Sequence, residues 1–544
     1  MPPLAAPLFD TAMRLLRSVR GLLALSRATP IDYPFADSDV AQLQRVSAAP
    51  DSFALDDQTW SDLLLGAYLD RVSGEVSIAG RQELYRRLRA GQDDAARAAF
   101  RERLRTLLDD PARAAAATEA LQPLRGADTE IAALLFEGEA AAPPRWLRWT
   151  ALLPLALAAS LAAVILSPLA WIGTAAVLYV LIALQMRYHE RVETWKRALN
   201  TVQLLLLATS RLGAALPGEP PDAAPAARRL HRSLSRSLLA RISPDLAGYG
   251  DWFALANVRH YFRSNAIVFR ERAFLRACWL RCAALEADLA LARHLQVHGG
   301  WCWAETSAAD ALEIEEGIHP LLAAPTGLSI ALRGQGAFIS GPNGAGKSTL
   351  LRMLGLNLVL ARAFGICHAR SARLPMLPVY ASMQNEDSLL DGRSLYMGEL
   401  ARARALLAAA EGPHPGLCLI DEIFRGTNHV ESVAAAAAVL DTLAARAFVL
   451  VSSHNLELAS LLEHRLAPYC LRRDGAGRLA LAPGVLDRTN GIALLGTQGF
   501  GAEIEHKAQQ VAAWLTGYLG RPEAGAHVLR AAGAPPPETR ARYG

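Results

Sequence analysis

A glycine-rich loop at residues 341–348 constrains the fold of this chain more than any other sequence feature. It reads Gly-Pro-Asn-Gly-Ala-Gly-Lys-Ser and fits the pattern G-x-x-x-x-G-K-[ST]. An apolar run, 337–340, precedes the loop, and a helix-forming run, 349–354, follows it. Between a strand and a helix, the backbone N–H groups of such a loop and the helix N-terminus converge on a polyphosphate. The sequence therefore predicts an α/β P-loop domain that binds a nucleotide.

The loop also predicts which residues bind ATP and Mg²⁺. We expect Lys347 to reach the β- and γ-phosphates and Ser348 to bind Mg²⁺. The chain has only three lysines, at positions 196, 347 and 507, because Arg fills its other basic positions. A compact ammonium at this one position favours phosphate binding over a chance glycine-rich loop, which is the alternative. The predicted ATP-binding residues are Gly341, Pro342, Asn343, Gly344, Ala345, Gly346, Lys347, Ser348 and Thr349.

Two further apolar runs end in residues suited to phosphate chemistry. Residues 417–420 lead to Asp421 and Glu422, and residues 447–453 lead to His454. Apolar runs of this length are typical of buried parallel strands. We expect Asp421 to hold Mg²⁺, Glu422 to polarise the attacking water and His454 to sense the γ-phosphate. Alone, His454 would be an ordinary core or surface residue, but its place after the other two motifs favours the functional role.

A third segment, 391–399, lies between the loop and the Asp-Glu strand. Gly392 permits a tight turn, and Ser394 can cap the helix that follows. A capped helix N-terminus can bind phosphate. Taken alone, the segment is equally consistent with an ordinary helix cap.

Hydropathy predicts a membrane segment. The 38 residues from Trp149 to Met186 carry no charge, which is too long for one span of about 20 residues. Ser167-Pro168 lies near the middle, so we expect a transmembrane hairpin of 149–167 and 169–186. Arg145, Arg148, Arg187 and Arg191 flank its ends and place both termini and the nucleotide domain in the cytoplasm, at a bacterial-type inner membrane. The alternative is a buried hairpin in a soluble core.

Composition excludes other classes. The net charge of +4 over 544 residues does not indicate a nucleic-acid binder by itself. The six cysteines show no metal-binding spacing. The basic segment 228–241 is typical of a solvated helix face, but it could also meet anionic lipid or a phosphate backbone. The expected domains are a basic amphipathic helix (1–30), a helical core (31–145 and 188–298), the hairpin (146–187), the nucleotide domain (299–519) and a disordered tail (520–544).

Taken together, the motifs resemble the ATPase end of the DNA mismatch-repair MutS family. The resemblance runs in order through Glu313–Pro320, the loop Gly341–Thr349 and Gly392–Glu399. It continues through Asp421–Asn428, Ser453–Leu458 and Gly491–Leu495. Upstream, 55–60 and 80–88 resemble the start of the family's helical core.

The resemblance implies an ABC-like ATPase that works as a homodimer with ATP and Mg²⁺. In this family the signature helix of one protomer caps the γ-phosphate bound to the other. Gly392 and Ser394 would therefore act in trans, and Arg425, Gly426, Thr427 and Asn428 would lie at the dimer interface. ATP binding would close the dimer and hydrolysis would reopen it.

Four departures from the family pattern accompany this resemblance. The helical core begins by about residue 50, which leaves no room for a mismatch-reading N-terminal domain. The loop has Gly344-Ala345 where Met-Gly is usual, and Phe424 replaces a glycine. The hairpin interrupts the helical core where the family's levers lead to the DNA clamp. These features resemble a membrane-anchored branch of the family.

Two functions follow from the sequence. The first is a membrane-anchored ATPase that keeps a DNA-binding, mismatch-repair-like role, with 228–241 as the DNA contact. The second is a membrane mechanoenzyme or scaffold ATPase without DNA activity, whose dimer closure is felt by the hairpin. An ABC transporter subunit is disfavoured, because one hairpin cannot build a translocation path and no Leu-Ser-Gly-Gly-Gln stretch is present.

Overall fold

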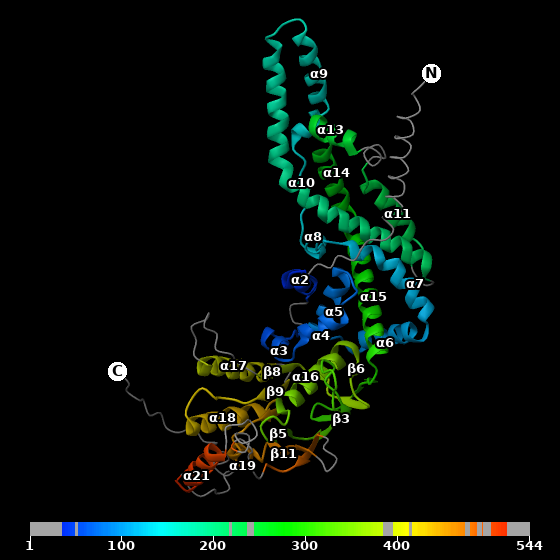
Figure 1. The fold of residues 1–544 in the computed structure, drawn as a ribbon. Coiled ribbons are helices and arrows are strands. Elements are labelled where there is room, and N and C mark those ends of the chain that lie inside the picture. The colour runs from blue at the N-terminus through cyan, green and yellow to red at the C-terminus, as the bar shows by residue number, and fades with distance from the viewer. Residues whose placement is uncertain are drawn as a thin grey trace, which may run out of the picture. The chain divides into compact units, whose positions relative to one another are not determined.

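The computed structural model describes residues 35–48, 53–216, 220–236, 244–383, 395–412, 416–473, 479–486, 492 and 502–518, and Figure 1 shows their elements. The chain divides into two compact units. The helical unit consists of Met1–Pro50, Val72–Arg86 and Glu102–Gln296. The sheet unit consists of Asp51–Arg71, Arg87–Arg101 and Val297–Gly544. The helix expected at 1–30 and the tail expected at 520–544 lie outside the described residues.

The helical unit is built from helices, and α5 and α6 also include residues that belong to the sheet unit. They pack through apolar faces of ordinary helical spacing, such as Ala224, Ala227 and Leu230 on α11. These helices are α2 (Asp37–Ser47), α5 (Ile78–Ala90), α6 (Asp94–Asp109), α7 (Pro111–Leu121), η1 (Gln122–Gly126), α8 (Ala132–Phe136), η2 (Arg145–Trp149), α9 (Leu152–Val164), α10 (Ala170–Ala215), α11 (Ala223–Leu234), α13 (Pro244–Ala254), α14 (Ala256–Arg270) and α15 (Arg272–His298).

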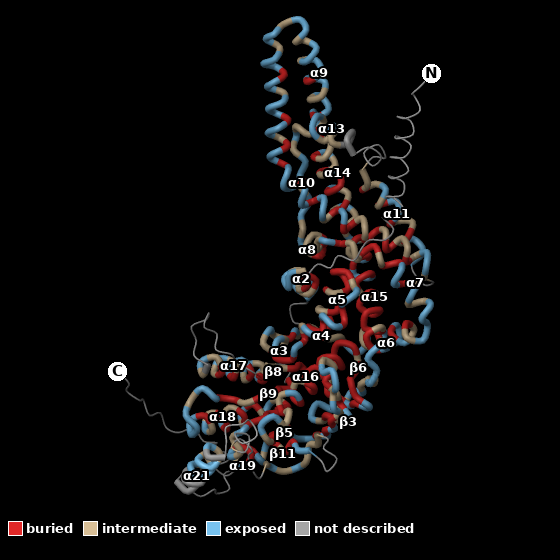
Figure 2. Tube along the Cα trace, in the orientation of Figure 1, coloured by how far each residue is buried: buried red, intermediate tan, exposed pale blue. Residues whose placement is uncertain are grey.

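Helices α9 and α10 form two apolar arms that pack against each other along the uncharged segment. Thr174 Oγ1 on α10 donates to Ser160 Oγ on α9 at 3.2 Å. Figure 2 shows both arms as largely exposed. Apolar side chains at the turn between them are among the most exposed, with Ile165 at 87 % and Leu166 at 89 %.

The expected pair of membrane spans is not what the structure supports. Among the described residues, only α10, with 46 residues, is long and apolar enough to cross a membrane. The 13 residues of α9 rise about 20 Å, which is short of a hydrocarbon core of about 30 Å. The second arm continues without a break into the helical core, because α10 runs from Ala170 to Ala215. The described part of the chain therefore contains one candidate span and one shorter apolar helix.

A six-stranded sheet organises the sheet unit in the order β12-β11-β5-β10-β9-β8. Five strands are parallel, and β12 pairs antiparallel with β11 at one edge. Strands β5, β9 and β10 are buried along their whole length, as their apolar sequences predict. The strands are β5 (Gly336–Ser340), β8 (Val379–Ser382), β9 (Leu417–Asp421), β10 (Phe448–Ser452), β11 (Leu466–Arg473) and β12 (Leu479–Pro483).

Smaller sheets and helices complete this unit. One sheet has the order β2-β7-β3-β4 and another pairs β1 with β6. The remaining elements are β1 (Cys302–Trp303), β2 (Glu305–Thr306), β3 (Ala311–Gly317), β4 (Leu328–Arg333), β6 (Ile366–Cys367), β7 (Ser371–Leu374), α3 (Asp57–Asp62), α4 (Leu65–Val72), α16 (Lys347–Phe364), α17 (Leu395–Ala410), α18 (His429–Ala444), α19 (Glu457–Leu462) and α21 (Ala502–Tyr518).

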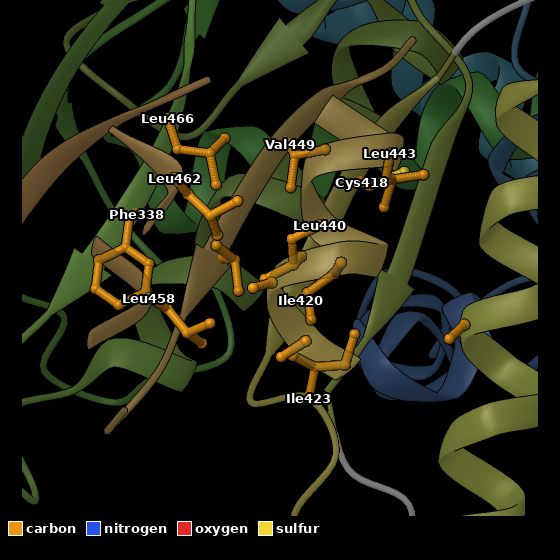
Figure 3. Close-up of a cluster of buried hydrophobic side chains, with 14 of the residues drawn as sticks. Phe338, Cys418, Ile420, Ile423, Leu440, Leu443, Val449, Leu458, Leu462 and Leu466 are labelled. Carbon is orange, nitrogen blue, oxygen red and sulfur yellow. The ribbon is translucent and has the colours of Figure 1, made fainter. Parts of the chain in front are cut away.

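Figure 3 shows the core on one face of the large sheet. Phe338 and Val449 from the strands pack with Leu440 of α18 and Leu458 of α19, and all four are fully buried. Each such side chain contributes about 1.5–3 kcal/mol of hydrophobic stabilisation. This core fixes the strands whose carboxyl ends carry the site described next.

Candidate nucleotide-binding site

The glycine-rich loop lies between β5 and α16, at the carboxyl edge of the parallel sheet. Gly344 has φ +74° and Gly346 has φ +95°, backbone conformations that residues other than glycine rarely adopt. Gly346 is also the N-cap of α16, so the loop turns directly into the helix N-terminus. This geometry directs backbone N–H groups and the positive end of the helix dipole toward one point, which suits a polyphosphate.

Lys347 is the first residue of α16, and its ammonium folds back over the loop. Lys347 Nζ donates to Gly341 O at 3.1 Å and lies 3.3 Å from His454 Nε2. Burial lowers the pKa of the lysine, while the carboxylates of Glu422 and Asp421 act in the opposite direction. Both carboxylates therefore lie close enough to Lys347 to influence its charge.

Asp421 and Glu422 follow from the register of neighbouring strands. Asp421 ends β9 and pairs with Ser452 of β10, whose hydroxyl donates to the Asp421 carboxylate. Glu422 has φ +58°, and its backbone N–H donates to Ser452 O at 2.9 Å. A glutamate held in this sparsely populated region stores strain, which is common at functional sites. The register thus places both carboxyl groups at the edge that carries the loop.

His454 lies between Lys347 and Glu422. Its Nε2 is 3.1 Å from Glu422 Oε1 and 3.3 Å from Lys347 Nζ. The structure therefore brings together Lys347, Glu422 and His454, which the sequence selected from three separate motifs. Such a cluster can bind phosphate, activate a water molecule and respond to the charge between them.

Ser348 and Asp421 are the predicted Mg²⁺ ligands. Ser348 lies in the first turn of α16 and Asp421 is buried at the end of β9. Within the described ranges, no three His, Cys, Asp or Glu side chains are grouped to hold a metal ion. A hydroxyl and a carboxylate are oxygen ligands of the kind that Mg²⁺ takes together with substrate phosphates.

Glu399 of α17 holds the loop that follows β9. Its carboxylate is buried and accepts from the backbone N–H groups of Arg425 at 3.1 Å and Gly426 at 3.2 Å. Arg425 Nε in turn lies 3.5 Å from Glu422 Oε2. Sequence reasoning assigned no role to Glu399, although it ends the family-like stretch 392–399. The structure connects that stretch to the predicted catalytic carboxylate.

The four residues predicted at a dimer interface lie directly before α18 in the chain. Asn428 caps this helix by accepting from Glu431 N at 3.0 Å, and Thr427 Oγ1 donates to Glu431 Oε2 at 2.8 Å. Arg425, Gly426 and Asn428 are exposed. Gly392 and Ser394, the predicted trans residues, lie outside the described residues.

Phe424 occupies the position where the family pattern has glycine. It has φ +58° and is fully buried, and its ring packs edge-on against Tyr396 at a centroid distance of 5.9 Å. The aromatic ring thus joins the core in a backbone conformation that glycine would adopt without strain.

Helix α3 and its N-cap, Asp56, form hydrogen bonds with residues on both sides of the segment 384–394. Asp62 Oδ2 accepts from Met383 N at 2.9 Å, and Thr59 Oγ1 accepts from Ala381 N at 3.0 Å. On the other flank, Arg402 of α17 donates to Asp56 Oδ1 at 3.1 Å. No local pattern predicts these contacts, because they join residues more than 300 positions apart in the sequence.

The MutS domain V family profile matches residues 337–515, a range that contains the glycine-rich loop, the Asp-Glu pair and His454. Over this range, about a third of its length, the chain is identified as a member of the MutS family. This finding confirms the family that the motifs indicated. It also agrees with the α/β fold of the sheet unit.

Several DNA mismatch repair proteins named MutS are similar to this MutS-family chain. The protein of Thermus aquaticus is 31 % identical over 255 residues, which cover 44 % of this chain and 31 % of that protein. The protein of Anaeromyxobacter dehalogenans (strain 2CP-C) is 30 % identical over 305 residues, covering 50 % of this chain and 34 % of that protein. The match therefore spans about a third of the length of these relatives.

Proposed function

We propose that this MutS-family protein is a membrane-anchored ATPase that uses ATP binding and hydrolysis to drive dimer closure and opening on DNA. The observation that carries the ATPase function is the convergence of Lys347, Glu422 and His454. His454 Nε2 lies 3.3 Å from Lys347 Nζ and 3.1 Å from Glu422 Oε1. The names of its relatives and the exposed arms support the DNA and membrane parts, respectively.

The nucleotide chemistry follows from the positions of these side chains. Bound ATP and Mg²⁺ supply the phosphoanhydride and the charge that neutralises its oxygens. Lys347 binds the β- and γ-phosphates, and Glu422 accepts the proton of the attacking water. His454, bonded to Glu422, contacts the γ-phosphate and reports its departure. Glu399 keeps the Arg425–Gly426 backbone, and through it Glu422, in position.

We propose that the dimer closes through the exposed residues of the loop that follows β9. We place Arg425, Gly426, Thr427 and Asn428 against a second copy of the chain, whose Gly392 and Ser394 complete the site. Glu422→Gln tests this arrangement: with ATP it should form a long-lived dimer, seen by light scattering after size exclusion. A Glu422→Gln protein that binds ATP and stays monomeric would contradict the trans site.

The membrane part rests on the distribution of apolar surface. In the most apolar 18-residue window of α10, only 17 % of residues are buried, unlike the core helix of a soluble protein. Arg187 and Arg191 follow the uncharged segment, as at a cytoplasmic boundary. We therefore propose that both arms enter the inner membrane from its cytoplasmic side, so that both termini and the nucleotide domain stay in the cytoplasm.

The DNA part assigns a contact surface to α11. Its apolar residues face the helical unit, while Arg228, Arg229 and Arg232 are exposed on the opposite side. Arg236 is bound to Asp251 at 2.6 Å, and Arg241 lies outside the described residues. Exposed arginines on one helix face suit a phosphate backbone.

The deciding experiment measures the ATPase rate of the full chain in liposomes, with and without duplex and mismatched DNA, across a range of salt concentrations. We expect DNA to change the rate, with a salt dependence that weakens in Arg228→Ala but not in the exposed control Arg404→Ala. A rate that ignores DNA but depends on the lipid would replace the DNA role with a membrane mechanoenzyme or scaffold.

A further inference from the structure

We infer that α13 is a second lipid-binding element, whose aromatic face lies in the headgroup layer of the membrane that receives the α9–α10 arms. This inference rests on the membrane part of the proposed function. Three aromatic side chains of α13 are exposed: Tyr249 at 64 %, Trp252 at 56 % and Phe253 at 37 %. Their spacing of three and four residues puts them on one helix face, where Tyr249 and Phe253 stack with ring centroids 6.3 Å apart.

The opposite side of α13 is fixed to the protein by polar contacts. Arg236 Nη2 binds Asp251 Oδ1 at 2.6 Å, and Gln185 Nε2 donates to Asp251 O, also at 2.6 Å. The helix ends at Ala254, and the next residue, Leu255, is fully buried with φ +49° and turns the chain into α14. These contacts hold the helix in place, so the exposure of its aromatic face is a fixed feature of this unit.

The contact with Gln185 also sets the level of α13 along the arm. Gln185 lies one residue before the end of the uncharged segment, and Arg187 follows Met186. At this level Trp146 of η2 packs against Tyr188, with ring centroids 5.7 Å apart. The aromatic face of α13 therefore lies where α10 changes from uncharged to charged residues.

Aromatic and basic side chains gather at this level. Trp149 is 66 % exposed, and Arg145, Arg148, Arg187 and Arg191 are all exposed. Trp and Tyr prefer the membrane–water interface because one end of each ring system is apolar and the other is polar. Nearby arginines add attraction to anionic headgroups. This composition, continuous with the apolar arms, fits the surface of an anionic bilayer.

Fluorescence quenching by depth-specific lipids tests the inference. The full chain, with the half-buried Cys302 replaced by Ser and its five buried cysteines kept, would carry one added cysteine at Trp252→Cys, Tyr179→Cys or Val430→Cys. The added cysteine would be labelled with an environment-sensitive fluorophore. Tyr179 is 74 % exposed on the arm, and Val430 is 72 % exposed on α18 as a control. Vesicles of phosphatidylcholine and phosphatidylglycerol would carry a nitroxide at the headgroup or in mid-chain. We expect position 252 to be quenched several-fold more by the headgroup nitroxide, position 179 by the mid-chain nitroxide and position 430 by neither.

The outcomes separate the two proposals. Quenching at 179 without quenching at 252 would overturn the role of α13 and leave the arm in the membrane. Stronger mid-chain than headgroup quenching at 252 would also overturn the interfacial placement. Absence of quenching at both positions would refute the membrane anchor itself. As a second measurement, replacing Tyr249, Trp252 and Phe253 by Ser should lower vesicle binding by about tenfold, whereas Val430→Ser should not change it.

Discussion

The nucleotide edge of the sheet unit and the α9–α10 arms depart from the usual distribution of residues in opposite ways. At the nucleotide edge, charged side chains such as Lys347, Asp421 and Glu399 are buried. Along the arms, large apolar side chains such as Ile165 and Ile172 are exposed. Both departures are informative, because soluble proteins seldom bury charges or expose continuous apolar surface.

The two regions differ in whether the protein itself compensates the departure. Each of the three buried charges has a hydrogen-bond partner: Lys347 has a carbonyl, Asp421 has Ser452 and Glu399 has two backbone N–H groups. The exposed arm residues have no such compensation within the helical unit, and water is a poor solvent for them. The protein therefore compensates its buried charges at the nucleotide edge by itself, whereas the arms leave their apolar surface uncovered in the described part of the helical unit.

Removing the charges of the nucleotide edge should have the largest effect. Lys347→Ala should lower the ATPase rate by more than about 100-fold, because the ammonium that binds the phosphates is lost. Glu422→Gln should slow hydrolysis by about 10²–10⁴-fold while nucleotide binding persists, because only the proton acceptor is removed. Steady-state ATPase and binding of a fluorescent ATP analogue measure the two effects. Normal turnover by Lys347→Ala would refute the nucleotide site.

A charge on the arms should weaken the association of the protein with membranes. Ile172→Asp places a carboxylate in the apolar segment at a residue that is 69 % exposed. The expected penalty for insertion is about 2.5–3.5 kcal/mol, so membrane association in a vesicle flotation assay should fall about 100-fold. Val430→Asp, at a similarly exposed residue of α18, serves as the control. Equal flotation of the two variants would show that the arms do not enter lipid.

The sequence predicted the elements of the nucleotide edge well because its signals are local. The glycine pattern, the apolar strand before it and the Asp-Glu pair each lie within about ten residues, and strand burial follows from composition. The convergence of Lys347 with His454 depends on strand order, which the order of the motifs suggested only through the family resemblance.

Other features could not be predicted because they depend on distant pairing. The bracing by Asp62 and Thr59 joins α3 to β8 across more than 300 residues and has no local pattern. The turn of the apolar segment falls at the predicted Ser167-Pro168, between α9 and α10. The length of the first arm was predicted wrongly, because hydropathy does not show where a helix begins: residues 145–149 form the 3-10 helix η2, and α9 has only 13 residues.

A smaller effect should follow from loosening the loop beside the predicted catalytic carboxylate. Glu399→Gln keeps the size of the side chain but loses the charge that accepts from Arg425 N and Gly426 N. We expect kcat to fall about tenfold with KM nearly unchanged, because the loop positions Glu422 without binding ATP itself. Glu411→Gln is a control, because Glu411 pairs with Arg446 on the surface. A rise in KM alone would indicate that Glu399 acts on nucleotide binding instead.

The smallest expected effect concerns Glu286 in the helical unit, a buried carboxyl group outside both regions. It accepts from Ser77 Oγ and from Gly80 N, the latter at 3.0 Å, and burial raises its pKa to about 7. Between the ordinary glutamate pKa and about 7, the folded state therefore binds a proton more tightly than the unfolded state does. The free energy of unfolding should fall as pH rises through this window, by at most about 1.4 kcal/mol per pH unit.

Glu286→Gln should remove this slope, because the amide does not titrate. Urea unfolding of the detergent-solubilised chain between pH 4.5 and 7.5 measures it, and the advantage of the variant over the wild type should grow with pH. Parallel pH profiles for the two proteins would show that Glu286 is already ionised in the folded state. In that case its three donors, Ser77 Oγ, Ser77 N and Gly80 N, would outweigh its burial, as the partners of the charged groups do at the nucleotide edge.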